Sequence, residues 1–141
     1  MLIDSNVFIY ALNSASPKHQ AARLFLRARA GEAVVAHQNI LEVTRVMSHP
    51  AFPAKLALKI VIKAVEQVVK PMRIIYPNEE TYFVYQELIR KYALEGNRVF
   101  DVYLAATAIT NGIRKIATDD EKHFRVLEEI KVVNPFTSAR R

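Results

Sequence analysis

Five short apolar runs recur along the 141-residue chain, each separated from the next by a segment long enough to form a helix. Apolar strands that alternate with helices are typical of a parallel α/β sheet, and strands that are apolar at successive positions are covered on both faces. The pattern predicts one α/β domain over residues 1–141, with a central parallel sheet of four to five short strands flanked by helices. The expected strands lie at residues 2–3, 33–36, 74–75, 116–117 and 132–133.

Helix signals mark the segments between the strands. Ser16 and Pro17 are residue types favoured at the N-cap and at the first position of a helix. Asn39 and Glu42 have the spacing of a capping box, which predicts that a helix begins there. Apolar residues at helical spacing, with Asn and Gly at the ends, indicate the others. Helices are predicted over residues 17–30, 40–49, 54–69, 79–94 and 100–111, and a flexible basic tail over residues 136–141.

Composition excludes several kinds of chemistry. The chain has no cysteine, which rules out thiol catalysis, disulfides and zinc held by thiolates. It carries 20 Lys and Arg against 14 Asp and Glu, a formal net charge of +6 that favours polyanionic partners such as nucleic acid. The first residues do not read as a signal peptide, and no apolar run reaches the roughly 20 residues that span a bilayer. We therefore expect a cytoplasmic protein with no membrane partner.

Acidic residues follow the predicted strands, at the edge where α/β sheets bind ligands. Asp4 comes directly after the first strand, Glu42 lies on the helix after the second, and Asp119 and Asp120 follow the fourth. Asp101 stands at the start of the helix that leads into the fourth strand. Because ligands bind beyond the carboxyl ends of parallel strands, we expect these acids to converge. Each alone also has a structural interpretation, as a turn former, a helix cap or a partner of the helix dipole.

Converging carboxylates favour a metal site. Like charges held together resist ionisation, and a divalent cation offsets that cost. Mg²⁺ and Mn²⁺ are the hard cations that suit a site made only of oxygen ligands. Such a cluster is what two-metal hydrolysis of a phosphodiester requires. Three polar residues beside these acids, Asn6, Thr118 and Asp119, are expected to orient a carboxylate, a water molecule or a phosphate.

The order of these residues forms a recognisable set. It consists of Asp4-x-Asn6, Glu42, Asp101-x-x-x-Ala105-Ala106 and Thr118-x-Asp120-x-x-x-Phe124. The set covers nearly the whole chain and resembles the PIN-domain nucleases, most of all the VapC toxins of prokaryotic toxin–antitoxin pairs. By this resemblance the catalytic and metal-binding acids are Asp4, Glu42, Asp101 and Asp120. Asp119 occupies a position that varies in the family, and the sequence leaves open which of the two adjacent acids serves.

The resemblance implies a Mg²⁺- or Mn²⁺-dependent endoribonuclease that acts on RNA, forms a homodimer and is inhibited by a small antitoxin protein. Two other functions stay open on the sequence. One is a structure-specific DNA nuclease on a similar acidic scaffold, and the other is a non-catalytic module that binds nucleic acid or a regulatory partner. The sequence indicates neither the RNA target and its cleavage motif nor the antitoxin, the metal used in the cell or the dimer face.

Overall fold

The predicted strands pair into one parallel sheet, which confirms the expected α/β architecture. The computed structural model describes residues 1–137. Leu2 of the central strand is in register with Val34 on one side and with Ile116 on the other. The strand order is β3-β2-β1-β4-β5, with β1 at Leu2–Ile3, β2 at Val34–Ala36, β3 at Arg73–Ile75, β4 at Lys115–Ala117 and β5 at Lys131–Val133.

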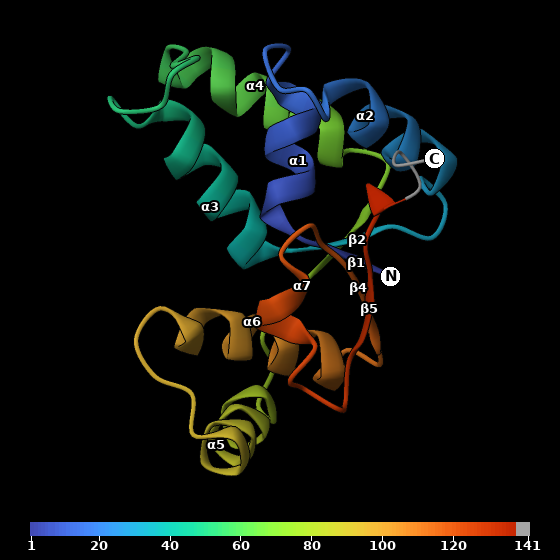
Figure 1. Ribbon diagram of the computed structural model, residues 1–141, viewed down its shortest axis with the longest axis vertical. Coiled ribbons are helices and arrows are strands. Elements are labelled where there is room, and N and C mark those ends of the chain that lie inside the picture. The colour runs from blue at the N-terminus through green and yellow to red at the C-terminus, as the bar shows by residue number, and fades with distance from the viewer. Residues whose placement is uncertain (138–141) are drawn as a thin grey trace.

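Helices occupy most of the connecting segments in residues 1–137. They are α1 (Ser5–Leu12), α2 (His19–Ala28), α3 (His37–Ser48), α4 (Leu58–Val69), α5 (Thr81–Tyr92), α6 (Arg98–Thr110) and α7 (Glu121–Phe124). Figure 1 shows α1 to α4 on one side of the sheet and α5 to α7 on the other. The sheet is therefore the middle layer of three.

Alternation along the strands divides the apolar core between the two faces. Successive residues of a strand point to opposite faces of the sheet. Leu2 packs in a buried cluster that includes Leu104 of α6 and Phe124 of α7. Ile3 packs in a second buried cluster that includes Phe8 of α1. The short central strand is thus covered on both faces, as its apolar sequence requires.

The sequence pattern does not predict α1, which begins directly after the two residues of β1. Val7 and Phe8, like the two residues after them, are types enriched in strands. Tertiary packing outweighs that preference, because both side chains are buried in the core. Asp4 is the N-cap of this helix, and its Oδ1 accepts a hydrogen bond from the Ser5 amide at 2.7 Å. The turn from strand to helix therefore fixes Asp4 at the edge of the sheet.

All five predicted helices begin two to four residues from their expected starts, and α4, for example, begins at Leu58 and not at residue 54. α2 begins at His19, two residues after the expected position. α3 begins at His37, directly after β2, so Asn39 lies in its first turn and is not its N-cap. Asn39 Oδ1 instead accepts a hydrogen bond from the amide of Ala36 at 3.2 Å, as the third helical residue of a capping box does. The amide nitrogen Nδ2 of Asn39 can therefore donate a hydrogen bond to another residue, which is Ser5.

The chain after β5 returns to the N-terminal part of the fold. Phe136 is buried, and its ring lies edge-on to that of Tyr10 with the centroids 5.5 Å apart. The remaining residues of the predicted basic tail, 138–141, lie outside the described residues. No helix within residues 1–137 is both long and apolar enough to cross a bilayer.

Candidate active site

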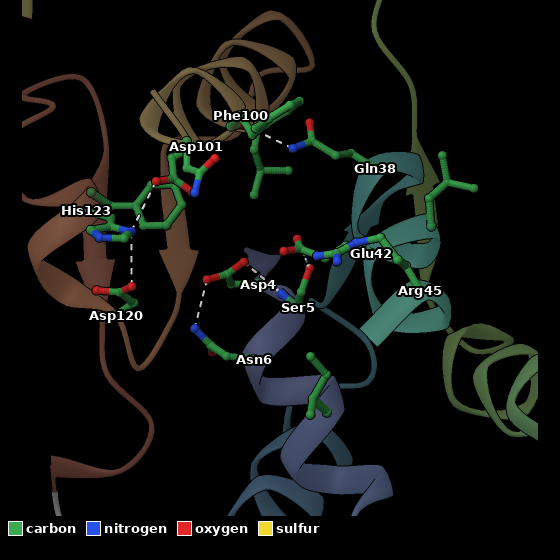
Figure 2. Close-up of a pocket in the computed structure, with 15 residues that line it drawn as sticks. Asp4, Ser5, Asn6, Gln38, Glu42, Arg45, Phe100, Asp101, Asp120 and His123 are labelled. Carbon is green, nitrogen blue, oxygen red and sulfur yellow. Dashed lines mark hydrogen bonds and ion pairs between the residues drawn. The ribbon is translucent and has the colours of Figure 1, made fainter. Parts of the chain in front are cut away.

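A cavity of about 770 Å³ opens at the carboxyl edge of the sheet. Its floor is formed by Asp4, Ser5 and Asn6, which follow β1. Asp120 and His123 reach it from the start of α7, after β4. Figure 2 shows these side chains around a common space. Residues from opposite ends of the chain meet here because β1 and β4 are neighbours in the sheet.

One face of α3 and one face of α6 form the two walls of the cavity. Residues spaced i, i+3, i+4 and i+7 share one face of a helix, and both walls have this spacing. Gln38 Nε2 donates a hydrogen bond to the backbone oxygen of Phe100 at 3.0 Å, which ties the walls together. The α3 wall comprises Gln38, Leu41, Glu42 and Arg45, and the α6 wall comprises Asn97, Phe100, Asp101 and Leu104 (Figure 2).

Asp4 is the most buried acid of the cavity, with 9% of its surface exposed. Its Oδ2 accepts hydrogen bonds from Thr118 Oγ1 at 2.6 Å and from Asn6 Nδ2 at 3.0 Å. Burial raises the pKa of Asp4 to about 6, although the hydrogen bonds from Thr118 and the Ser5 amide oppose the rise. The negative charges of Glu42 and of the α6 acid raise this pKa further.

Thr118 and Asn6 form a polar link between the floor and the α7 side. Thr118 Oγ1 accepts hydrogen bonds from Asn6 Nδ2 at 2.9 Å and from the Asp120 amide at 3.0 Å. Asn6 Oδ1 accepts one from the Asp119 amide at 3.2 Å. Because Thr118 also donates to Asp4, these two side chains fix the floor acid and the loop after β4 relative to each other.

Glu42 is held by two residues that sequence reasoning missed. Ser5 Oγ donates a hydrogen bond to Glu42 Oε2 at 2.7 Å, and Asn39 Nδ2 donates to Ser5 Oγ at 3.0 Å. Asn39 is fully buried and Ser5 nearly so, which keeps this chain of hydrogen bonds out of water. The signal in the sequence was the position of Ser5 directly after Asp4, at the edge where ligands bind.

His123 joins the two remaining acids. Its Nδ1 lies 3.1 Å from Asp101 Oδ2 and 3.0 Å from Asp120 Oδ2 (Figure 2). Arg98 Nε lies 3.4 Å from the same Asp101 oxygen, and an Arg98 guanidinium nitrogen donates to the backbone oxygen of His123. Burial raises the pKa of Asp101, and the neighbouring acids Asp120 and Glu42 add to this, while His123 and Arg98 oppose it.

The structure separates the adjacent acids Asp119 and Asp120. Asp120 lines the cavity, whereas Asp119 lies outside it. The carboxylate of Asp119 forms an ion pair with Lys18 and accepts a hydrogen bond from the Tyr10 hydroxyl at 3.0 Å. Burial would raise the pKa of Asp119, but these hydrogen bonds from Lys18 and Tyr10 outweigh it and the pKa is lowered. Asp119 therefore has the features of a structural ion pair.

The donor set of the cavity suits a hydrated divalent cation. Four carboxylates line one space, and burial with mutual repulsion raises the pKa of two of them, a cost that a cation offsets. Within residues 1–137 no three acidic or histidine side chains close around one point. Mg²⁺ is commonly bound through only one or two carboxylates and keeps several water molecules. The residues present therefore fit such an ion.

The raised pKa of Asp4 predicts how the stability of the metal-free protein depends on pH. An unfolded Asp titrates near 3.8 and the folded Asp4 near 6, so the folded protein binds this proton more tightly. Metal-free stability should therefore fall as the pH rises from about 4 to about 6, and stay lowered above that. The difference between the two pKa values corresponds to a loss of about 3 kcal/mol in the free energy of unfolding at pH 7. Asp4→Asn removes the titration, so in EDTA the free energy of unfolding of the variant, relative to that of the native chain, should rise from about pH 4 to about pH 6.5 and stay level above that.

Urea unfolding of the two proteins across this pH range checks the prediction. The other acids titrate in both proteins, so the difference between them isolates the Asp4 carboxyl group. A difference in unfolding free energy that does not change with pH would show that Asp4 titrates like an exposed acid.

Comparisons with known proteins identify the family and the fold of this chain. A model of the PIN domain matches residues 1–129, while no curated relative matches the chain. FitAcB of Neisseria gonorrhoeae has 22% sequence identity and a TM-score of 0.75, over 96% of this chain and 98% of that one. VapBC2 of Rickettsia felis, solved with a DNA fragment from its promoter, has 17% identity and a TM-score of 0.74, over 94% and 96%. Mycobacterium tuberculosis VapC20, described as a sarcin-ricin loop cleaving toxin, has 11% identity and a TM-score of 0.68, over 89% and 94%.

At these identities the solved structures show a shared fold, and the family match carries the assignment. The match spans most of the chain and includes all four acids of the cavity. This chain therefore belongs to the PIN domain family, a family of nucleases, as the order of its acids predicts.

Proposed function

We propose that this chain is a metal-dependent endoribonuclease that acts as the toxin of a toxin–antitoxin pair. The observation that carries the proposal is the gathering of four carboxylates, from four separate segments of the chain, around one open cavity. Membership of the PIN family supports a nuclease, and the toxin and antitoxin proteins among the similar folds support the biological role. The formal net charge of +6 suits a polyanionic substrate.

In this proposal the acids hold Mg²⁺ or Mn²⁺. Asp4, Asp101 and Asp120 are the direct ligands, and Glu42 is either a further ligand or the anchor of a water molecule. The bound cation supplies positive charge against the phosphodiester and lowers the pKa of water. His123 Nδ1 lies within hydrogen-bond distance of both Asp101 and Asp120, so these two carboxylates face a common point.

The chain's own residues orient the acids and leave the attack on phosphorus to water. Two hydroxyls contact the acids of the cavity, and both are buried: Ser5 donates to Glu42 and Thr118 donates to Asp4, which makes them positioning groups. The chain has no cysteine. We therefore expect in-line attack by water and no covalent intermediate. Thr118 and Asn6 keep Asp4 in a single orientation through two hydrogen bonds to one oxygen.

The proposal includes two protein partners. Solved structures of similar fold contain complexes named VapBC and FitAB, so we expect a small antitoxin that binds this chain and blocks the cavity. We also expect a homodimer, on the family resemblance.

A cleavage assay with matched substrates tests the proposed function. Purified protein with Mg²⁺ is incubated with single-stranded RNA, structured RNA, and a flapped DNA duplex. The proposal predicts internal cleavage of RNA and none of the DNA. Cleavage confined to the flapped DNA would favour the structure-specific DNA nuclease. No cleavage of any substrate, together with no Mg²⁺ binding by calorimetry, would favour the non-catalytic binding module.

A further inference from the structure

Two large apolar side chains are exposed at the mouth of the acidic cavity. Phe100 on α6 is 64% exposed and Leu41 on α3 is 61% exposed. Each directly precedes a cavity acid on its own wall, Asp101 and Glu42 respectively. Burying a side chain of this size commonly stabilises a fold, yet neither residue is used in the core. An aromatic ring thus lies open to solvent beside the carboxylates of the site.

The α3 wall also carries a cation that is available to a ligand. Arg45 lines the cavity one turn after Leu41 and is exposed. It forms no ion pair among residues 1–137, whereas Arg98 at the start of α6 is paired with Asp101. Figure 2 shows Arg45 on the Glu42 side of the cavity, away from the α6 wall that carries Phe100. A guanidinium group suits a phosphate because its N–H donors match the phosphate oxygens.

We propose that an unpaired base of single-stranded RNA stacks on the Phe100 ring while Arg45 binds a phosphate of the same strand across the cavity. This rests on the proposed ribonuclease function and assigns two side chains of the cavity to the substrate strand. The cavity lining offers the groups that a nucleotide strand uses: an apolar face for a base, a cation for a phosphate, and carboxylates in the same cavity. A ring beside the acids places the base next to the phosphodiester that is cleaved.

A base can stack on Phe100 only if it is not already stacked and paired within an RNA duplex. In duplex RNA the bases are stacked on each other, and proteins read them mainly where loops, bulges or single strands expose them. The site should therefore prefer single-stranded RNA or a loop to a continuous duplex. A protein partner would also cover an exposed ring, but the guanidinium of Arg45 at the same cavity and the formal net charge of +6 favour a polyanionic strand.

The test is a binding cycle that combines protein and RNA changes, measured in EDTA so that no cleavage interferes. The probe is a fluorescein-labelled single-stranded RNA of about 12 nucleotides. Phe100→Leu should raise its Kd about tenfold, and Phe100→Trp should restore binding. Phe83, a similarly exposed phenylalanine on α5 outside the cavity, provides the control, because Phe83→Leu should leave the Kd unchanged.

Abasic nucleotides placed in turn along the RNA complete the cycle. At one position the missing base should weaken binding by the native protein about tenfold and leave binding by Phe100→Leu unchanged, because the ring then has nothing to stack on. A change in folding alone would not depend on the position of the abasic site. Thermal melting of both variants shows whether they are folded.

Salt dependence tests the second half of the proposal. Arg45→Gln should reduce the slope of log K against log salt by about 0.7, the amount for one phosphate contact to a single strand. Arg27→Gln, on the exposed face of α2, is the control and should keep the slope.

The outcomes separate this proposal from the function on which it rests. RNA cleavage by the native protein, with equal RNA binding by Phe100→Leu, would overturn the stacking site and leave the ribonuclease in place. If Phe100→Leu instead alters only the self-association of the chain, the ring is a protein contact and the proposal is wrong. If the native protein neither binds nor cleaves RNA, both proposals fail.

Discussion

Replacing Asp4 by Asn is expected to reduce RNA cleavage by about 10³-fold or more, because it removes several kcal/mol of charge stabilisation at the metal site. The variant should stay folded. Asn is as good a helix N-cap as Asp, so the bond from the Ser5 amide is kept. The substitution also removes a buried charge that is repelled by its neighbours. Initial rates of cleavage and thermal melting, measured on one preparation, check both expectations.

Measuring cleavage and thermal melting together distinguishes a catalytic acid from a structural one. A residue needed for the fold would lose stability and activity together, whereas Asp4→Asn should lose only activity. Cleavage at the native rate by the folded variant would mean that Asp4 has no part in the reaction, and the acidic cavity would then not be the active site.

The adjacent acids after β4 should behave in opposite ways. Asp120→Asn is expected to reduce cleavage about 10²-fold or more, because it takes an oxygen ligand from the cavity. Asp119→Asn should change cleavage less than about twofold, because this carboxylate is bound to Lys18 and Tyr10 outside the cavity. Its loss should cost at most about 1 kcal/mol of stability, the usual value of a partly exposed ion pair.

The pair is well matched, since both changes remove one negative charge from neighbouring positions. Cleavage rates of the two variants, measured at a single metal concentration, are sufficient to show which of the two acids takes part in the reaction. Equal losses in both would show that Asp119 turns into the site when substrate and metal are bound. A loss in Asp119→Asn alone would reverse the assignment of the fourth acid.

Much of this fold follows from local sequence pattern. The apolar runs at β1 and β4 predict strands that are covered on both faces, and the parallel sheet then brings the acids after them to one edge. For that reason the amino-acid sequence alone predicts that Asp4 and Asp120 lie close together. The helices α3 and α6 carry their acids on the cavity face through ordinary helical spacing. The catalytic roles of these acids remain predictions.

Other features depend on contacts that no local pattern contains. Helix α1 consists largely of strand-favouring residues and forms because Val7 and Phe8 are buried against the sheet. Asn39 looks like a helix cap in the sequence, yet it reaches across to Ser5, a residue far away in the chain. Which of two adjacent acids enters the cavity depends on the backbone path after β4.

The exposed ring of Phe100 does not follow from the sequence either. It lies within an apolar helix in which other apolar residues, such as Val102 and Leu104, are buried. Only the position of α6 relative to α3 shows that this residue faces the cavity and not the core. Exposed residues at the mouth of a cavity, such as this one, can therefore be identified only from the tertiary structure.

The most direct test of the central claim is cleavage of one single-stranded RNA by the native protein in excess EDTA and again after Mg²⁺ or Mn²⁺ is added beyond the EDTA. We predict no cleavage in EDTA and full recovery with metal, with Asp4→Asn inactive in both conditions. Native cleavage that continues unchanged in EDTA would contradict a carboxylate site that works through a bound cation.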